Sequence, residues 1–152
     1  MSHDLATWLP RQRWYGDKDR EIAGVRLIEA APFALAEVQF RAGRASLYQV
    51  GEAEDTAQHG RWLELLQSSA KVRGRAGVFE YETWDHWEAG GNSRLLGAEQ
   101  SNTSVLYHTA AGEPSAILKL FRRLQAGENP EIEMPRALAR SGRFDHVPRG
   151  WG

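Results

Sequence analysis

The chain has 152 residues, of which 41% are hydrophobic and 26% charged, a composition typical of globular proteins that excludes the disordered and fibrous classes. Lysine and arginine together number 19 against 20 for aspartate and glutamate, so the charge disfavours binding to nucleic acid or to an anionic membrane. The absence of cysteine excludes disulfides, thiolate metal sites and a cysteine nucleophile. The N-terminus lacks the pattern of a signal peptide, and no apolar run approaches the roughly 18 residues of a membrane span, so we expect a cytoplasmic protein.

The first elements are a short helix and a group of strands. Ser2 or Asp4 can cap a helix that Pro10 ends or redirects. Residues 22–50 then alternate between apolar and polar side chains in three short stretches, with Gly43 in one of the gaps. This pattern predicts three strands of an antiparallel meander.

The middle of the chain is less regular. Residues 52–59 are polar, and the apolar group at residues 62–66 suggests a brief amphipathic helix. Gly74 and Gly77 break the chain, and residues 78–82 suggest another strand.

A domain boundary is expected after these elements. Thr83 can cap a short helix that carries Trp84 and Trp87, and two glycines follow it. We therefore expect an N-terminal subdomain over residues 1–90 and a second subdomain over residues 91–152.

The second subdomain is expected to be a hairpin followed by a helix. A strand at residues 105–108 leads through a loop into an antiparallel strand at residues 116–121. Asn129 is a good N-cap, Pro130 suits the first helical position, and Gly142 suits the position after the helix.

Lys119 lies in the middle of the apolar second strand of this hairpin. Burying a lone ammonium group costs several kcal/mol unless a carboxylate or phosphate compensates it. Glu131 and Glu133 lie near the start of the following helix, and a strand lysine held by a helix glutamate is how protein kinases bind the α- and β-phosphates of ATP. The alternative is that Lys119 lies on the solvent face of an edge strand, with its stem packed and its ammonium group in water.

A polar segment precedes the lysine strand. Its hydroxyl and amide groups can cradle phosphate oxygens in a tight turn, although such residues also form ordinary polar turns. The residues of this segment are Gln100, Ser101, Asn102, Thr103 and Ser104.

The aromatic residues and histidines give weaker indications. Six tryptophans suit either core packing or stacking on sugars, and we expect core packing because most have aliphatic neighbours. Arg11, Arg13, Trp14 and Tyr15 could contact single-stranded nucleic acid, but the cluster is short and the chain nearly neutral. The histidines lack the spacing of metal ligands, so we infer no metal site.

Four segments, at residues 8–16, 99–104, 117–124 and 129–133, resemble segments of maltokinases and related sugar kinases. The resemblance implies an α+β fold: a cap subdomain of antiparallel β-sheet with helices, followed by an intermediate subdomain similar to a kinase N-lobe. In that family the full enzyme uses ATP and Mg²⁺ to phosphorylate the anomeric hydroxyl of maltose.

The resemblance also assigns roles to the residues identified above. Lys119 would bind the α- and β-phosphates, Glu133 would orient it with Glu131 as the competing partner, and the polar segment would cover the phosphates. The catalytic aspartate and the metal ligands of such kinases lie in a C-terminal lobe, and no motif for them is present here. We therefore expect the chain alone to be inactive, to bind ATP weakly at most, and to self-associate through the surface that meets the missing lobe.

Two other functions remain open from the sequence. The chain could be an interaction module that docks on trehalose synthase or on another enzyme of glucan metabolism. It could also be a carbohydrate-binding module that uses exposed tryptophans.

Overall fold

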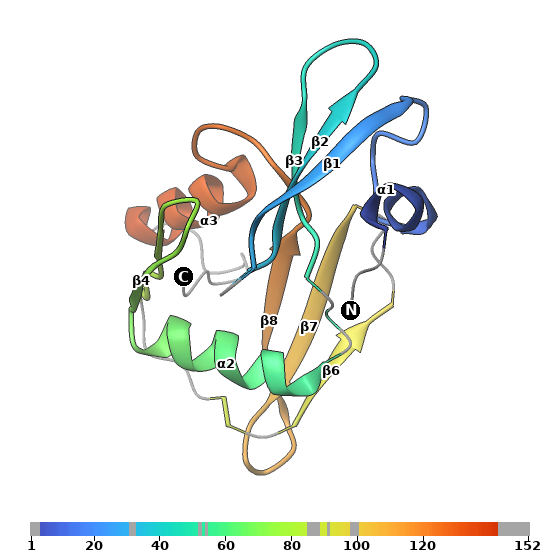
Figure 1. The fold of residues 1–152 in the computed structure, drawn as a ribbon. Helices are drawn as coiled ribbons and strands as arrows, with labels where there is room; N and C mark the ends of the chain where they lie inside the picture. The colour runs from blue at the N-terminus through green and yellow to red at the C-terminus, as the bar shows by residue number, and fades with distance from the viewer. Residues whose placement is uncertain are drawn as a thin grey trace.

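The computed structural model describes residues 4–30, 33–51, 53, 55–84, 89–90, 92–97 and 101–142. Within these ranges the fold is α+β with antiparallel sheets, which confirms the predicted class (Figure 1). The elements in chain order are α1 (Leu5–Trp8), η1 (Leu9–Arg11), β1 (Ile22–Glu29), β2 (Leu35–Phe40), β3 (Ser46–Gln49), α2 (Thr56–Gln67), β4 (Lys71–Arg73), β5 (Val78–Glu80), β6 (Ser93–Leu96), β7 (Asn102–His108), β8 (Pro114–Phe121), β9 (Arg123–Leu124) and α3 (Pro130–Ser141).

The first sheet contains the predicted meander and has the order β1-β2-β3-β9. The carboxylate of Asp4 caps α1 by accepting a hydrogen bond from the backbone N–H of Ala6, as predicted, whereas Ser2 lies outside the described residues. The core of this part joins the sheet to the aromatic N-terminal segment, and its buried members are Leu9, Tyr15, Ala36, Val38, Phe40, Tyr48 and Val50. Trp8 and Trp14 pack against this core, in agreement with the expected role of the tryptophans.

The second core lies between α2 and the sheet β6-β7-β8. Figure 1 shows α2 running across these strands. The buried members of this second core are Ala53, Trp62, Leu63, Val105, Tyr107 and Leu120. Helix α2 begins at Thr56, within the polar stretch at residues 52–59, and Asp55 caps it. The first turn of the helix is exposed to solvent, which explains why its residues are polar. Buried side chains at helical spacing begin only at His59 and Trp62.

The hairpin of β4 and β5 was only half predicted. Strand β4 was missed because Lys71 and Arg73 are exposed and only Val72 between them is partly buried. The hydroxyl of Thr83 donates to the carbonyl of Leu66 in α2, and no helix is assigned at Thr83 or at the residue after it. Trp87, which was expected on that helix, lies outside the described residues.

The two parts of the chain are in direct contact. Strand β9 pairs antiparallel with β3, although β9 belongs to the second half of the sequence and β3 to the first. Helix α2 likewise comes before residue 90 and packs on strands that follow it. The boundary between residues 90 and 91 stays a prediction. No helix in the described ranges has the length and apolar character needed to cross a membrane.

Gly74 is predicted to resist substitution, because a Cβ atom there would collide with the buried carboxylate of Glu29 and crowd the ring of Phe79. Glu29 cannot easily move, since it accepts hydrogen bonds from the backbone N–H groups of Arg75 and Ala76. Gly74→Ala should lower the free energy of unfolding by about 1–3 kcal/mol in a urea titration.

Gly60→Ala is the matched control for this substitution. Gly60 lies within α2, and a Cβ atom there would meet no atom within 4 Å. Alanine at this position should raise the free energy of unfolding by about 0.5–1 kcal/mol, because it favours the helix. Equal effects of the two substitutions would contradict the assigned packing at Gly74.

Candidate functional site

Lys119 lies on β8, the edge strand of the sheet β6-β7-β8. Its side chain is 35% exposed, and its ammonium group forms an ion pair with the carboxylate of Glu131. The same nitrogen lies 5.7 Å from the centre of the Phe121 ring. The structure therefore combines both interpretations of the sequence, since Lys119 lies on an edge strand and has a carboxylate partner.

The ion pair is formed with Glu131, one of the two glutamates that the sequence left open, and a role of Glu133 at this site stays a prediction. The first turn of α3 is held by its cap. The side chain of Asn129 accepts a hydrogen bond from the backbone N–H of Glu131 at 2.9 Å, which fixes the first turn. Two residues along a helix correspond to a rotation of roughly 200°, so Glu131 and Glu133 cannot both face the same strand.

The polar segment before the lysine strand is not a turn at residues 102–104. Asn102, Thr103 and Ser104 belong to β7 and pair with residues of β8, so part of their backbone hydrogen bonding is used in the sheet. Hydroxyl side chains are compatible with a strand, and this is the reason for the error. Ser101 precedes β7 and is exposed, whereas Gln100 lies outside the described residues.

The hydroxyl groups of β7 have different surroundings. Thr103 accepts a hydrogen bond from the guanidinium of Arg122 at 2.8 Å, which gives it a structural contact. Ser104 is 1% exposed, and its hydroxyl has no hydrogen-bond partner among the described residues. The phosphate-binding role of the polar segment stays a prediction.

The register places Lys119 on the face of the sheet opposite the core. Lys119 is paired with Ser104, whereas the neighbouring pair of Val105 and Leu118 contributes to the core cluster. Directly opposed residues of antiparallel strands have side chains on the same face. Ile117, two residues before Lys119, is therefore on the lysine face, and it is 60% exposed. Lysine and an accessible apolar surface thus lie together on this face.

Arg122 directly follows β8, and its contacts with the first sheet were not predicted. Its buried guanidinium donates to the carbonyl oxygens of Gln49 at 3.3 Å and Gly51 at 2.7 Å. It also lies over the ring of Trp14, 4.6 Å from the ring centre. The strand that carries Lys119 is therefore attached to the first sheet at its end. In the sequence, the only indication of this attachment is an arginine placed directly after an apolar strand.

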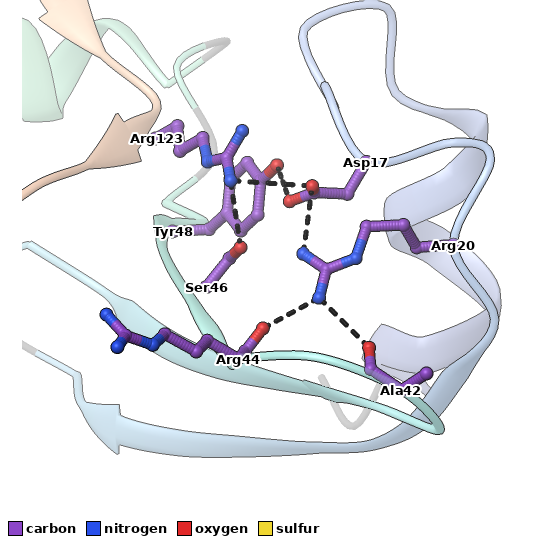
Figure 2. A network of polar contacts seen from close by, with 7 residues as sticks. All are labelled: Asp17, Arg20, Ala42, Arg44, Ser46, Tyr48 and Arg123. Atoms are coloured by element: carbon purple, nitrogen blue, oxygen red, sulfur yellow. Dashed lines mark hydrogen bonds and ion pairs between the residues drawn. The ribbon is translucent and has the colours of Figure 1, made fainter.

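A second polar network lies beside this junction and centres on Asp17 (Figure 2). The hydroxyl of Tyr48 donates to the Asp17 carboxylate at 2.7 Å, and Arg20 donates to it at 3.2 Å. Arg123 of β9 lies 3.5 Å from the same carboxylate and donates to the hydroxyl of Ser46 at 3.3 Å. The network therefore connects the N-terminal segment to β3 and β9.

The network changes the acidity of its members. Burial tends to raise the pKa of Asp17, but the hydrogen bond from Tyr48 and those from neighbouring side chains outweigh burial and lower it. Burial, followed by the hydrogen bond to Asp17, raises the pKa of Tyr48 above its ordinary value. Asp17 is therefore held as a carboxylate and Tyr48 as a neutral phenol, which is the state that the hydrogen bond requires.

A comparison with protein families gives a match over residues 8–58 to a model described as the maltokinase N-terminal cap domain. The matched residues run from the end of α1 through β1, β2 and β3 into the first turn of α2. No solved structure shows a significant match to the chain. The family match supports a maltokinase-related N-terminal part.

Asp17→Asn is predicted to destabilise the chain in a pH-dependent way. At about pH 7 the substitution should cost about 1–3 kcal/mol, because it leaves two guanidinium groups without their shared carboxylate. Since the folded-state pKa of Asp17 is lowered, its contribution is present above the unfolded-state value of about 3.9 and is lost as the pH falls through the folded-state value. Urea titrations should show that the difference between wild type and variant shrinks below about pH 4.

Asp19→Asn is the control, since Asp19 is an exposed acid in the same loop. It should change the free energy of unfolding by less than about 0.5 kcal/mol. A difference between wild type and Asp17→Asn that is independent of pH would contradict the assigned charge of Asp17.

Proposed function

We propose that this chain is the N-terminal cap together with the ATP-phosphate-binding portion of a maltokinase-like sugar kinase. The family match over residues 8–58 supports the first part of the proposal. The ion pair of Lys119 with Glu131, on the accessible face of an edge strand, is the observation that carries the second part.

Lys119 has the chemistry needed for phosphate binding. Its ammonium group can donate charge-assisted hydrogen bonds to phosphate oxygens, and such bonds are about twice as strong as neutral ones. Glu131 holds the ammonium group in place through an ion pair. Because an ammonium group has three N–H donors, the others can still point toward a ligand. Ile117 on the same face offers an apolar surface beside the charge, as a nucleotide requires.

The polar segment contributes less directly to the proposed site. Ser101 is exposed just before β7, and Asn102, which pairs with Phe121 on the lysine face, is partly exposed. The hydroxyl of Ser104 is opposite Lys119 in the register but buried, so it contacts a ligand only when the covering atoms move.

In the full enzyme, Mg²⁺ would accompany ATP and be held by its phosphates and by ligands of the catalytic lobe. In the ranges covered by the structure, no group of three or more histidine, aspartate or glutamate side chains is arranged to hold a metal ion. The proposed role is phosphate binding, and phosphoryl transfer to maltose belongs to the full enzyme with its catalytic lobe.

Lys119→Met is predicted to weaken the binding of ATP by about tenfold, because a charged hydrogen bond to phosphate is lost while the size of the side chain is kept. Titration of the chain with ATP, followed by tryptophan fluorescence or calorimetry, measures the change. Glu131→Gln should weaken binding less, since the ammonium group remains but is no longer held.

Lys71→Met is the matched control for this prediction. Lys71 lies on β4, is exposed and pairs with Glu80, so the substitution removes the same charge at a different place. It should leave the affinity for ATP unchanged. Equal affinities of wild type and Lys119→Met would refute the proposed role of Lys119.

A further inference from the structure

Helix α3 carries Glu131, and none of its described side chains belongs to either hydrophobic core cluster. Its largest exposed apolar side chain, Met134, is 58% exposed. Two polar contacts link described residues of α3 to the rest of the chain. One is the ion pair of Glu131 with Lys119, and the other is formed by Arg136.

Arg136 attaches α3 to the segment that follows β5. Its guanidinium lies 3.5 Å from the carboxylate of Glu82 and pairs with Glu128, which precedes the helix. The same group lies over the ring of Trp84, 4.3 Å from the ring centre. Figure 1 shows α3 beside the hairpin of β4 and β5, in agreement with these contacts.

These contacts fix both the position and the rotation of the helix. A guanidinium that stacks on a ring and bridges two carboxylates is held in one plane, unlike a simple ion pair. Arg136 follows Glu131 by five residues, so any rotation of α3 about its axis moves both side chains together. Because one residue of a helix corresponds to a rotation of about 100°, a small slip would carry Glu131 away from Lys119.

We propose that Arg136 is a positioning residue, which holds α3 so that Glu131 reaches Lys119. The expected effect of Arg136 on ATP binding rests on the function proposed above, whereas its effect on the position of Glu131 does not. Through Glu82 and Trp84, the segment after β5 then sets the geometry of the lysine site, although it makes no contact with Lys119. This gives the N-terminal part of the chain a role in that site.

The lysines of the chain provide a direct test. The sequence contains three, at positions 18, 71 and 119. An ammonium group that donates to a carboxylate is shielded from an acylating reagent, so the rate of acetylation by acetic anhydride, read by mass spectrometry, reports the pairing of each lysine. Arg136→Met should raise the rate at Lys119 roughly two- to fivefold, the effect expected for a weakened exposed ion pair.

The other two lysines separate positioning from a general loss of structure. Lys71 lies on the hairpin that leads into Glu82, so its rate would rise if the variant loosened this region. Lys18 is exposed in the loop before β1 and reports on the N-terminal segment. We expect both rates to stay at their wild-type values in Arg136→Met. Arg140→Met removes the same charge from an exposed position one turn later, and it should leave the rate at Lys119 unchanged.

A second variant leaves α3 intact. Glu82→Lys reverses the charge that faces Arg136 and should raise the rate at Lys119 by a smaller factor. Glu131→Gln sets the upper limit of the rate. The proposal is overturned if Arg136→Met leaves Lys119 as protected as in wild type, or if all three lysines become equally reactive.

The labelling experiment contains no nucleotide and is therefore independent of the proposed function. Titration of Arg136→Met with ATP then measures the consequence, which is an affinity between those of wild type and Lys119→Met. If wild type itself fails to bind ATP, the proposed function fails, whereas positioning of Glu131 is still decided by the labelling rates.

Discussion

The guanidinium of Arg122 is the contact on which the union of the two sheets depends. A buried guanidinium is tolerated only when its donors are satisfied, and here the acceptors are two backbone carbonyls of the first sheet region and a hydroxyl of β7. The ring of Trp14 covers one face of the group. Separating the sheets would break the hydrogen bonds to Gln49 and Gly51 and the contact with Trp14, so the arrangement is held by more than apolar packing.

Strand β8 carries Lys119 and is directly followed by Arg122, and these two cations have different surroundings. Lys119 lies on the accessible face of β8, and Arg122 at the end of that strand is directed into the junction. Gln49, Gly51 and Trp14, which surround Arg122, all lie within the segment that matches the maltokinase cap domain. The recognised segment is therefore physically attached to the strand that carries the candidate site. The Asp17 network reinforces this attachment through Arg123, one residue further along the chain.

Local patterns in the sequence were sufficient for much of the fold. The meander, the antiparallel hairpin and the capped helix that begins at Pro130 follow from alternation and capping, and all three are confirmed. Strand β9 and the partners of Arg122 could not be predicted in this way, because they depend on pairings between residues more than 70 positions apart. Within the site, the lysine and a nearby glutamate were predictable. The choice between Glu131 and Glu133 depends on the rotation of α3, which tertiary contacts determine.

This dependence on tertiary contacts distinguishes α3 from the other elements around the site. The sheet that carries Lys119 is anchored by a buried core and a buried guanidinium, so its position responds little to solvent. Helix α3 is held by partly exposed ion pairs, which ionic strength weakens, and by one ring contact. The lysine is thus positioned by buried contacts, whereas its carboxylate partner is positioned by ion pairs and a ring contact nearer the surface. Because none of the described side chains of α3 belongs to either core cluster, weakening these contacts should alter the lysine site more than the cores.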